Sequence, residues 1–193
     1  MSRSRRAVCV FCGSRSGGLN DYEADAEDLG RFLAETGYQL VYGAGDVGLM
    51  GAVARGCMEA GGETLGVIPE HLIAREQGRQ DLTRFVVTET MHERKKVMFM
   101  NSDAIVLRPG GAGSLDEFFE VLTWAQLGLH AKPILLLNTA GFWDPLHALV
   151  QHVIAQGFAE NSLATFYELV PDWQGAHPAL TAWMESYATL ASV

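Results

Sequence analysis

Residues 39–68 read "QLVYGAGDVGLMGAVARGCMEAGGETLGVI", and this stretch decides the fold. It opens with the β-rich run "QLVY" and passes through the glycine loop "GAGDVG". A helical segment then ends at Gly61 or Gly62, and the strand-like run "TLGVI" follows. A strand, a crossover helix and a second strand form a unit whose two strands lie parallel. The stretch therefore predicts a parallel sheet that is covered by helices.

The same alternation continues on both sides of this unit. A strand-like run at 7–11 precedes a helical pattern at 21–37, in which Ala26, Leu29 and Phe32 recur at helical spacing. Downstream, strand-like and helical runs alternate as "RFVVTE", "MHERKKVMFMNS", "DAIVLR", "SLDEFFEVLTWAQLG", "PILLLN" and "WDPLHALVQHVIAQG". We therefore expect an α/β protein with a doubly wound parallel sheet in three αβα layers. We expect a single domain over residues 1–193, with a disordered tail at 1–6 and a terminal helix at about 178–190.

Composition and charge exclude several classes of protein. A net charge of −9 argues against a nucleic-acid binder, which would present a basic face. No apolar run approaches the roughly 20 residues of a membrane span, and "AVCVF" is too short for a signal-peptide core. A cytoplasmic protein is therefore expected. Cys9 and Cys12 form a C-x-x-C, but no second cysteine pair completes a zinc site, so core cysteines are favoured and no metal is expected.

Three glycine loops follow predicted strands and precede predicted helices: "CGSRSGG", "GAGDVG" and "PGGAGS". Because ligands bind at the carboxyl ends of parallel strands, the three loops are expected along one edge of the sheet. "GAGDVG" matches the dinucleotide fingerprint, but it follows the second strand rather than the first, and the acidic Glu70 fits the expected spacing only loosely. A loop that lets backbone approach a phosphate or ribose is favoured over a nicotinamide or flavin site.

The stretch "LRPGGAGSLDE" at 107–117 supports two interpretations. Its glycines and the following helix start can present backbone N–H groups to a phosphate, and Ser114 adds a hydroxyl donor. Alternatively, Ser114 and Glu117 have the spacing of a capping box, in which the glutamate folds back onto the helix end. A catalytic Glu117 would instead point into the cleft. The local sequence leaves both interpretations open.

Two helical segments carry further signals. "MHERKKVM" at 91–98 places Arg94, Lys95 and Lys96 side by side. Neighbouring residues on a helix point roughly 100° apart, so the three cannot share one site, and the local pattern favours a solvated helix face. The helix after "PGGAGS" is apolar around much of its circumference. Such a helix is buried on more than one side, which suggests a homodimer.

The motifs "VFCGSRSG", "LVYGAGDVGLMG", "GVIP", "MHERKKVM" and "PGGAGSLDE", followed by "TWAQLGLHAKP", resemble those of one enzyme family. They are similar to the LOG (lonely guy) family of cytokinin-activating phosphoribohydrolases, formerly labelled lysine decarboxylases, over residues from about 7 to 158. The resemblance implies a Rossmann-like homodimer that needs no metal or redox cofactor. It also implies hydrolysis of the N-glycosidic bond of a nucleoside 5′-monophosphate, which releases the free base and ribose 5-phosphate.

The resemblance also implies roles for individual residues. Arg94 and Glu117 would be the catalytic pair. The residues implied to bind substrate are Glu76, Lys95, Gly110, Gly111, Ala112, Gly113, Ser114 and Thr123.

The chain departs from the family pattern at four positions. Ser114 replaces a usual threonine, which keeps the hydroxyl, and Ala44 replaces a usual glycine. Arg108 replaces a usual apolar residue, and the place of Arg15 is open.

Breaking a ribosidic C–N bond builds positive charge on the ribose, which the Glu117 carboxylate would stabilise, helped by Glu76. Arg94 would either assist the departing base or clamp the phosphate, and the base itself is open between a cytokinin and adenine. The main alternative is a non-catalytic nucleotide-binding module. An NAD(P)-dependent oxidoreductase and a pyridoxal-dependent decarboxylase are disfavoured, the latter because no lysine has a pyridoxal-type context.

Overall fold

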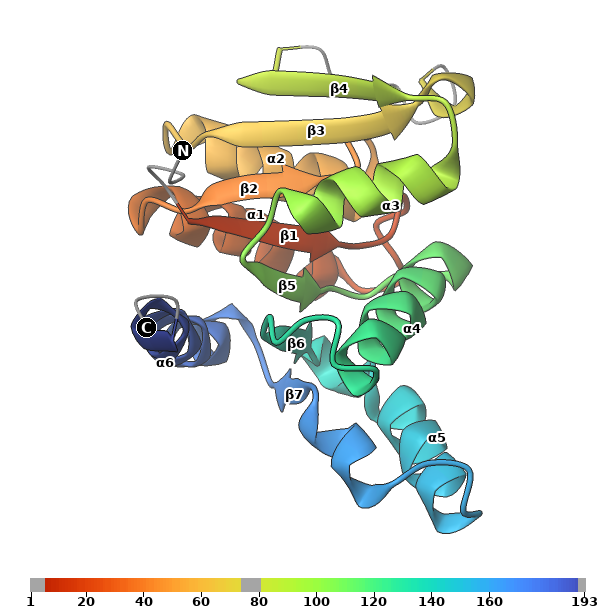
Figure 1. Ribbon diagram of the computed structural model, residues 1–193. Coiled ribbons are helices and arrows are strands. Elements are labelled where there is room, and N and C mark those ends of the chain that lie inside the picture. The colour runs from red at the N-terminus through yellow and green to blue at the C-terminus, as the bar shows by residue number, and fades with distance from the viewer. Residues whose placement is uncertain (1–5, 74–80, 191–193) are drawn as a thin grey trace.

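The computed structural model describes residues 6–73 and 81–190, with side chains up to residue 182. Its described part contains one sheet of seven parallel strands, in the order β4-β3-β2-β1-β5-β6-β7 (Figure 1). The strands are β1 (Ala7–Phe11), β2 (Gln39–Tyr42), β3 (Thr64–Pro69), β4 (Arg84–Thr88), β5 (Ala104–Leu107), β6 (Ile134–Leu137) and β7 (Glu168–Val170).

The helices are α1 (Asn20–Glu35), α2 (Gly48–Glu59), α3 (Met91–Met100), α4 (Ala112–Gln126), α5 (Asp144–Ala155) and α6 (Trp173–Leu190). Helices α1 to α5 each connect two successive strands, and α6 follows β7. Short 3-10 helices follow β3, β6 and α5 as η1 (Glu70–Leu72), η2 (Thr139–Gly141) and η3 (Asn161–Thr165).

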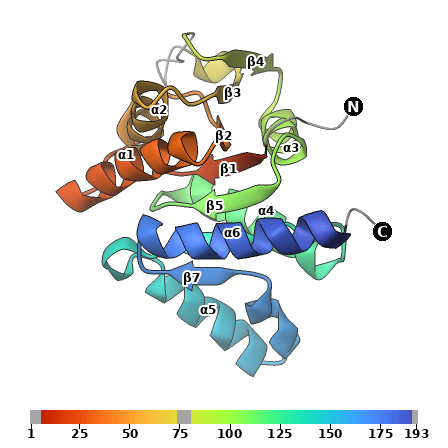
Figure 2. The same cartoon turned by 90° about the vertical axis from the view of Figure 1, so that its left-hand side faces the viewer.

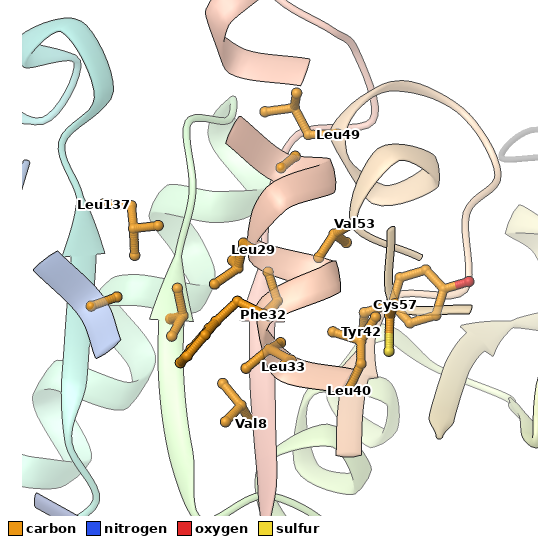
Figure 3. Packing of buried hydrophobic residues seen from close by; sticks show 14 of the residues in the cluster. Val8, Leu29, Phe32, Leu33, Leu40, Tyr42, Leu49, Val53, Cys57 and Leu137 are labelled. Atoms are coloured by element: carbon orange, nitrogen blue, oxygen red, sulfur yellow. The ribbon is translucent and has the colours of Figure 1, made fainter. Parts of the chain in front are cut away.

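The helices cover both faces of the sheet and make three layers (Figure 2). Successive side chains of a strand point to opposite faces, and β1 shows this alternation. Val8 and Val10 join the core formed with α1, α2 and α6, part of which is shown in Figure 3. Ala7, Cys9 and Phe11 join the core formed with α3, α4 and α5. Both faces of the strand are apolar, which explains the continuous hydrophobic run "AVCVF".

The order of strands reverses at β1. The chain builds outward from β1 through β2 and β3 to β4, and then returns to place β5 on the other side of β1. The connections that leave β1 and β5 therefore diverge and open a crevice at their carboxyl ends, where open α/β sheets bind ligands.

The doubly wound αβα architecture expected from the sequence is confirmed, and six of the seven strands fall where their apolar runs predict. β7 was not anticipated. Its three residues carry a glutamate and are too short to show a period, and they are defined mainly by pairing with β6. No helix in the described part of the chain is long and apolar enough to cross a membrane.

The two ends of the chain differ from the expectations. The terminal helix begins at Trp173 rather than at about residue 178, and it continues through Pro178, the residue at which the expected helix began. The tail expected at 1–6 lies outside the described residues except for Arg6. The Arg6 carbonyl accepts a hydrogen bond from the Gln39 N–H at 2.9 Å, so this residue already takes part in the sheet.

Candidate active site

A cavity of about 450 Å³ opens where β1 and β5 diverge. Its walls come from the loop after β1, the ends of β2 and β5, the first turns of α4, one side of α3, and Phe142 after β6. Two of the three predicted glycine loops contribute several residues each to its lining, and the third contributes Gly43. Connections that are far apart in the sequence thus meet at one edge of the sheet, as predicted.

The glycine loop after β5 forms one wall of the cavity. Its lining residues include every loop position expected to hold a phosphate: Gly110, Gly111, Ala112, Gly113 and Ser114. The helix α4 begins at Ala112, so its first backbone N–H groups have no carbonyl within the helix to bond. A Cβ atom on Gly110 would collide with the Ser114 hydroxyl, which is why this position needs glycine.

The capping interpretation of Glu117 is wrong. The N-cap of α4 is Gly111 and no side chain caps the helix, so Ser114 already lies within the first turn. Glu117 lies in the second turn, and its half-buried side chain lines the cavity. Its negative charge is close enough to the buried Cys9 thiol to contribute, after burial itself, to a raised Cys9 pKa. Glu117 therefore belongs to the lining of the cavity and not to the cap of its helix.

Arg94 is buried, with 5 % of its surface exposed, which overturns the expectation of a solvated helix face. Its Nε donates to the Val67 carbonyl at 3.1 Å, and one terminal nitrogen donates to the Gly43 carbonyl at 2.7 Å. A capping box formed by Thr90 and Glu93 fixes the start of α3 immediately before it. The guanidinium is thus held at the ends of β2 and β3, where it lines the cavity.

Lys95 is also buried, but it points to α4 rather than to the cavity. Its Nζ pairs with Asp116 at 2.8 Å and with Glu120 at 3.1 Å. Burial lowers the Lys95 pKa, but the hydrogen bonds and charges of the two carboxylates outweigh burial, so the pKa is raised. Lys95 ties the helix that carries Arg94 to the helix that carries Glu117. Only Lys96 of the three neighbouring cations is exposed as expected.

One other expected substrate contact, Thr123, is not among the described residues that line the cavity. Thr123 is exposed on α4, and its hydroxyl donates to the Phe119 carbonyl at 2.6 Å. Glu76 lies outside the described residues.

The sequence did not identify several residues of the site. The loop after β1 contributes Cys12, Ser14 and Arg15 to the cavity. Tyr22 and Phe142 contribute two aromatic rings, which meet edge to face with their centroids 5.9 Å apart. The motif "CGSRSGG" signals a loop, but the aromatic residues belong to segments with no motif of their own. The fold alone brings them to the cavity.

Arg108, which the sequence left unplaced, lies beneath the glycine loop rather than in the cavity. It is fully buried, pairs with Asp25 at 2.9 Å and donates to the Tyr22 carbonyl at 2.7 Å. The Thr139 hydroxyl donates to the same Asp25 oxygen. Burial lowers the Arg108 pKa, while the negative charge of Asp25 opposes that effect. This buried cluster joins the ends of β5 and β6 to α1.

The motif "GAGDVG" serves the site through its backbone. A Cβ atom on Gly43 would collide with the Arg94 guanidinium, and Gly48, with φ of 59°, leaves no room for a side chain against the backbone of Arg15. Ala44 also has a positive φ of 59°, the left-handed conformation that favours glycine, which accounts for the usual glycine there. The motif thus packs two loops of the cavity together. Among the described residues, no group of three or more His, Cys, Asp or Glu side chains is arranged to hold a metal ion.

The fold and the cavity together define a Rossmann-like α/β protein whose cavity at the switch point is lined by an arginine, a glutamate and a glycine loop that begins a helix. A family model described as "possible lysine decarboxylase" matches residues 50–180. The chain belongs to this family, the LOG family, as its curated relatives also show.

Three relatives illustrate this membership. The chain is 44 % identical over 96 % of its length, and 80 % of the relative's length, to a probable cytokinin riboside 5′-monophosphate phosphoribohydrolase of Oryza sativa subsp. japonica. A cytokinin riboside 5′-monophosphate phosphoribohydrolase of Arabidopsis thaliana is 39 % identical over 96 % of this chain and 85 % of its own length. A cytokinin riboside 5′-monophosphate phosphoribohydrolase of Rhodococcoides fascians is 40 % identical over 91 % of this chain and 89 % of its own length.

Solved structures support the fold. The molybdenum cofactor carrier protein of Chlamydomonas reinhardtii superimposes with a TM-score of 0.72 at 20 % identity, covering 94 % of this chain and 99 % of that one. The molybdenum cofactor binding protein of Rippkaea orientalis superimposes with a TM-score of 0.71 at 21 % identity, covering 94 % of this chain and 98 % of that one. At this level of identity the likeness concerns the fold alone.

Proposed function

We propose that this protein is an N-glycosyl hydrolase that converts a nucleoside 5′-monophosphate to the free base and ribose 5-phosphate. Its substrate is a cytokinin riboside 5′-monophosphate, AMP, or both. The observation that carries the proposal is that Arg94, Glu117 and the glycine loop at 110–114 all line one cavity. The names of the curated relatives support the same reaction. The cavity volume of about 450 Å³ falls within the range of small-molecule sites.

The glycine loop provides the anchor for the substrate. Backbone N–H groups at the start of α4, together with the partial positive charge of the helix end, suit a phosphate. Binding energy gained at the phosphate, remote from the reacting bond, would then position the ribose for reaction.

Glu117 stands on the same helix, in the turn after that anchor. Its carboxylate would stabilise the positive charge that develops on the ribose and orient the attacking water. The water oxygen bonds to C1′ as the bond from C1′ to the base nitrogen breaks. The electron pair of the broken bond and a proton go to the base.

The position of Arg94 favours one of its two possible roles, which are to assist the departing base or to clamp the phosphate. Its guanidinium is held by carbonyls of β2 and β3, whereas the glycine loop follows β5, and β1 separates β2 from β5. Neighbouring strands are about 4.8 Å apart, so the two ends of the site are roughly 10 Å apart. A nucleotide whose phosphate occupies the glycine loop therefore extends its base toward Arg94. We assign Arg94 to the departing base, where a cation offsets developing negative charge.

A homodimer through α4 is part of the proposal. Leu115, Phe119, Thr123 and Leu127 recur every four residues and are exposed, so they form one stripe along the helix. Three of the four are large apolar side chains, which a second copy of the chain would cover. Because Thr123 belongs to this stripe, any contact that it makes with substrate would be with the partner's cavity. Sedimentation analysis tests the oligomeric state.

Lys95 and Glu76 take different positions in the proposal. Lys95 supports the relative placement of α3 and α4 through its two carboxylate partners, and we propose this role instead of substrate contact. Glu76 remains a sequence-based prediction as a helper of Glu117. A cytoplasmic location accompanies the proposal, because none of Cys9, Cys12 and Cys57 is in a disulfide, as in a reducing compartment. Cell fractionation tests the location.

The reaction is tested by incubating the full chain with AMP and with isopentenyl-AMP, and by separating free base and ribose 5-phosphate by chromatography. Stoichiometric release of both products from either substrate is expected. Binding of AMP without release from either substrate would favour a non-catalytic nucleotide-binding module. Relative rates on the two substrates identify the preferred base.

A further inference from the structure

Arg15 is a cation in the cavity that the fold does not use. Among the described residues, the charged side chains that line the cavity are Arg15, Arg94 and Glu117. The Arg94 guanidinium is held by two backbone carbonyls. Arg15 is exposed, and within the described part of the chain its side chain makes no hydrogen bond or ion pair. Its charge is therefore available to a ligand.

The backbone that carries Arg15 is fixed although its side chain is not. The Gly13 N–H donates to the Pro109 carbonyl at 3.0 Å, and the Gly13 carbonyl accepts from the Leu49 N–H at 3.1 Å. A Cβ atom at Gly48 would lie 2.6 Å from the Arg15 Cα. The loop after β1 is thus wedged between the start of α2 and the end of β5. A fixed backbone with an unengaged side chain suits a residue that closes onto a ligand.

Arg15 is next to the glycine loop. A Cβ atom at Gly13 would lie 3.2 Å from the Gly110 Cα, so the two loops are in direct contact at the switch point. Arg15 follows Gly13 by two residues, whereas Arg94 is held at the ends of β2 and β3. Of the two cavity arginines, Arg15 therefore belongs to the phosphate end.

The charges of the cavity support the same assignment. Among the described residues of the lining, two arginines and one glutamate leave an excess of one positive charge. A phosphate monoester carries roughly −1.5 to −2 near neutral pH, and Glu117 alone would repel it. Arginine presents a planar fork that binds two phosphate oxygens at once. A cation beside the glycine N–H groups would complete the binding of such an anion.

We propose that Arg15 is a specificity-determining residue that clamps the 5′-phosphate against the glycine loop, so that the cavity selects nucleoside monophosphates over unphosphorylated nucleosides. This proposal rests on the proposed function for its substrate class. Its binding component stands separately, because a product phosphate can bind whether or not hydrolysis occurs.

The binding test uses calorimetry with ribose 5-phosphate, and with ribose as the unphosphorylated reference. The proteins are the full wild-type chain, Arg15→Ala, Arg15→Lys and the control Arg31→Ala. Arg31 is an exposed arginine on α1 that pairs with Asp28 outside the cavity. We expect Arg15→Ala to bind ribose 5-phosphate about 10- to 100-fold more weakly. Arg15→Lys should recover part of the loss, and Arg31→Ala should match wild type. Equal affinity of wild type and Arg15→Ala, or no binding by wild type, overturns the proposal.

The kinetic test compares AMP with adenosine. In Arg15→Ala the KM for AMP should rise by a similar factor with a much smaller change in kcat, and the preference for AMP over adenosine should shrink. An unchanged KM and preference would refute the role of Arg15 while leaving the proposed hydrolysis intact. Conversely, Arg15-dependent binding of ribose 5-phosphate without base release from any nucleotide would refute the hydrolysis and retain the phosphate site.

Discussion

The guanidinium of Arg94 lies directly against the backbone of Gly43, and one of its terminal nitrogens donates to the Gly43 carbonyl at 2.7 Å. The two residues are 51 positions apart in the chain. A Cβ atom at Gly43 would occupy the space of that nitrogen and would lie 2.9 Å from the Met50 sulfur. The glycine therefore fixes the place of a buried cation, and its substitution should affect the active site before it affects the fold.

We expect Gly43→Ala to lower kcat/KM on AMP at least about 100-fold, a loss of roughly 2.7 kcal/mol of transition-state stabilisation. The methyl group forces the Arg94 side chain out of its place at the base end of the cavity. The matched control is Gly18→Ala, because a Cβ atom at Gly18 meets nothing within 4 Å. Steady-state kinetics on both variants checks the prediction, and equal activity in the two would contradict it.

Glu117→Gln should reduce turnover about 100- to 10,000-fold, the range typical of removing a catalytic acid or base, with little change in melting temperature. The amide keeps the shape of the side chain but not its negative charge. Glu35→Gln is the control, because Glu35 is exposed at the end of α1 and is not among the residues that line the cavity. The test measures the rate of base release and uses circular dichroism to check that each variant is folded. Normal turnover by Glu117→Gln would show that the Glu117 carboxylate is not part of the mechanism.

One cysteine should react rapidly with iodoacetamide at pH 8. Cys12 is half-buried and lines the cavity, whereas Cys9 and Cys57 are buried. Burial raises the Cys57 pKa from its ordinary 9.0 to about 11 and the Cys9 pKa well above its ordinary value. These two thiols therefore stay protonated and unreactive until the pH rises much further. Mass spectrometry should locate the label on Cys12, and AMP should slow the labelling. Fast labelling of Cys57 would disagree with its burial.

Arg108→Met should lower the free energy of unfolding by about 3 kcal/mol, because it leaves Asp25 charged and poorly compensated under the glycine loop. Arg31→Met removes an arginine–aspartate pair of similar length, but the side chains of that pair are 48 % and 42 % exposed. It should change the stability by less than about 0.5 kcal/mol. Urea unfolding measures both. Similar losses in the two variants would show that burial of the Arg108 pair contributes nothing.

At micromolar concentration the protein should sediment as a dimer, and Phe119→Asp should convert it to a monomer of about 21 kDa. The substitution places a charge in the middle of the apolar stripe on α4, where a second copy would leave it buried and unpaired. Leu149→Asp is the control, because Leu149 is 49 % exposed and lies on a different helix, α5. A wild-type protein that sediments as a monomer would exclude the dimer.

Much of the fold could be predicted because each strand and helix has its own local pattern. The apolar runs of β1, β5 and β6 are buried on both faces, so each reads as a strand without any knowledge of its neighbours. β7 lacks such a pattern, since its position depends on pairing with β6. The cap of α4 was predicted three residues late, because the serine at 114 looks like a cap, while the cap is Gly111.

The features of the site also divide into those that the sequence predicts and those that only the fold reveals. The glycine loops and their common edge follow from sequence, because parallel strands end together. The burial of Arg94 and Lys95 does not follow from the sequence, because the carbonyls and carboxylates that hold them come from the residue after β2, from β3 and from α4. A run of charges on a helix looks solvated until those partners are in place.

The sequence by itself determined the order of the elements, the doubly wound sheet and the family pattern that joins "MHERKK" to "PGGAGSLDE". Each of these depends on residue types at short spacing, which local periodicity and turn chemistry control. The tertiary structure decided that Glu117 lines the cavity rather than capping its helix, and that Arg94 and Arg15 line the same cavity. Those outcomes depend on strands that are adjacent in the sheet but distant in the chain, and pairing between distant strands is fixed only when the whole core packs.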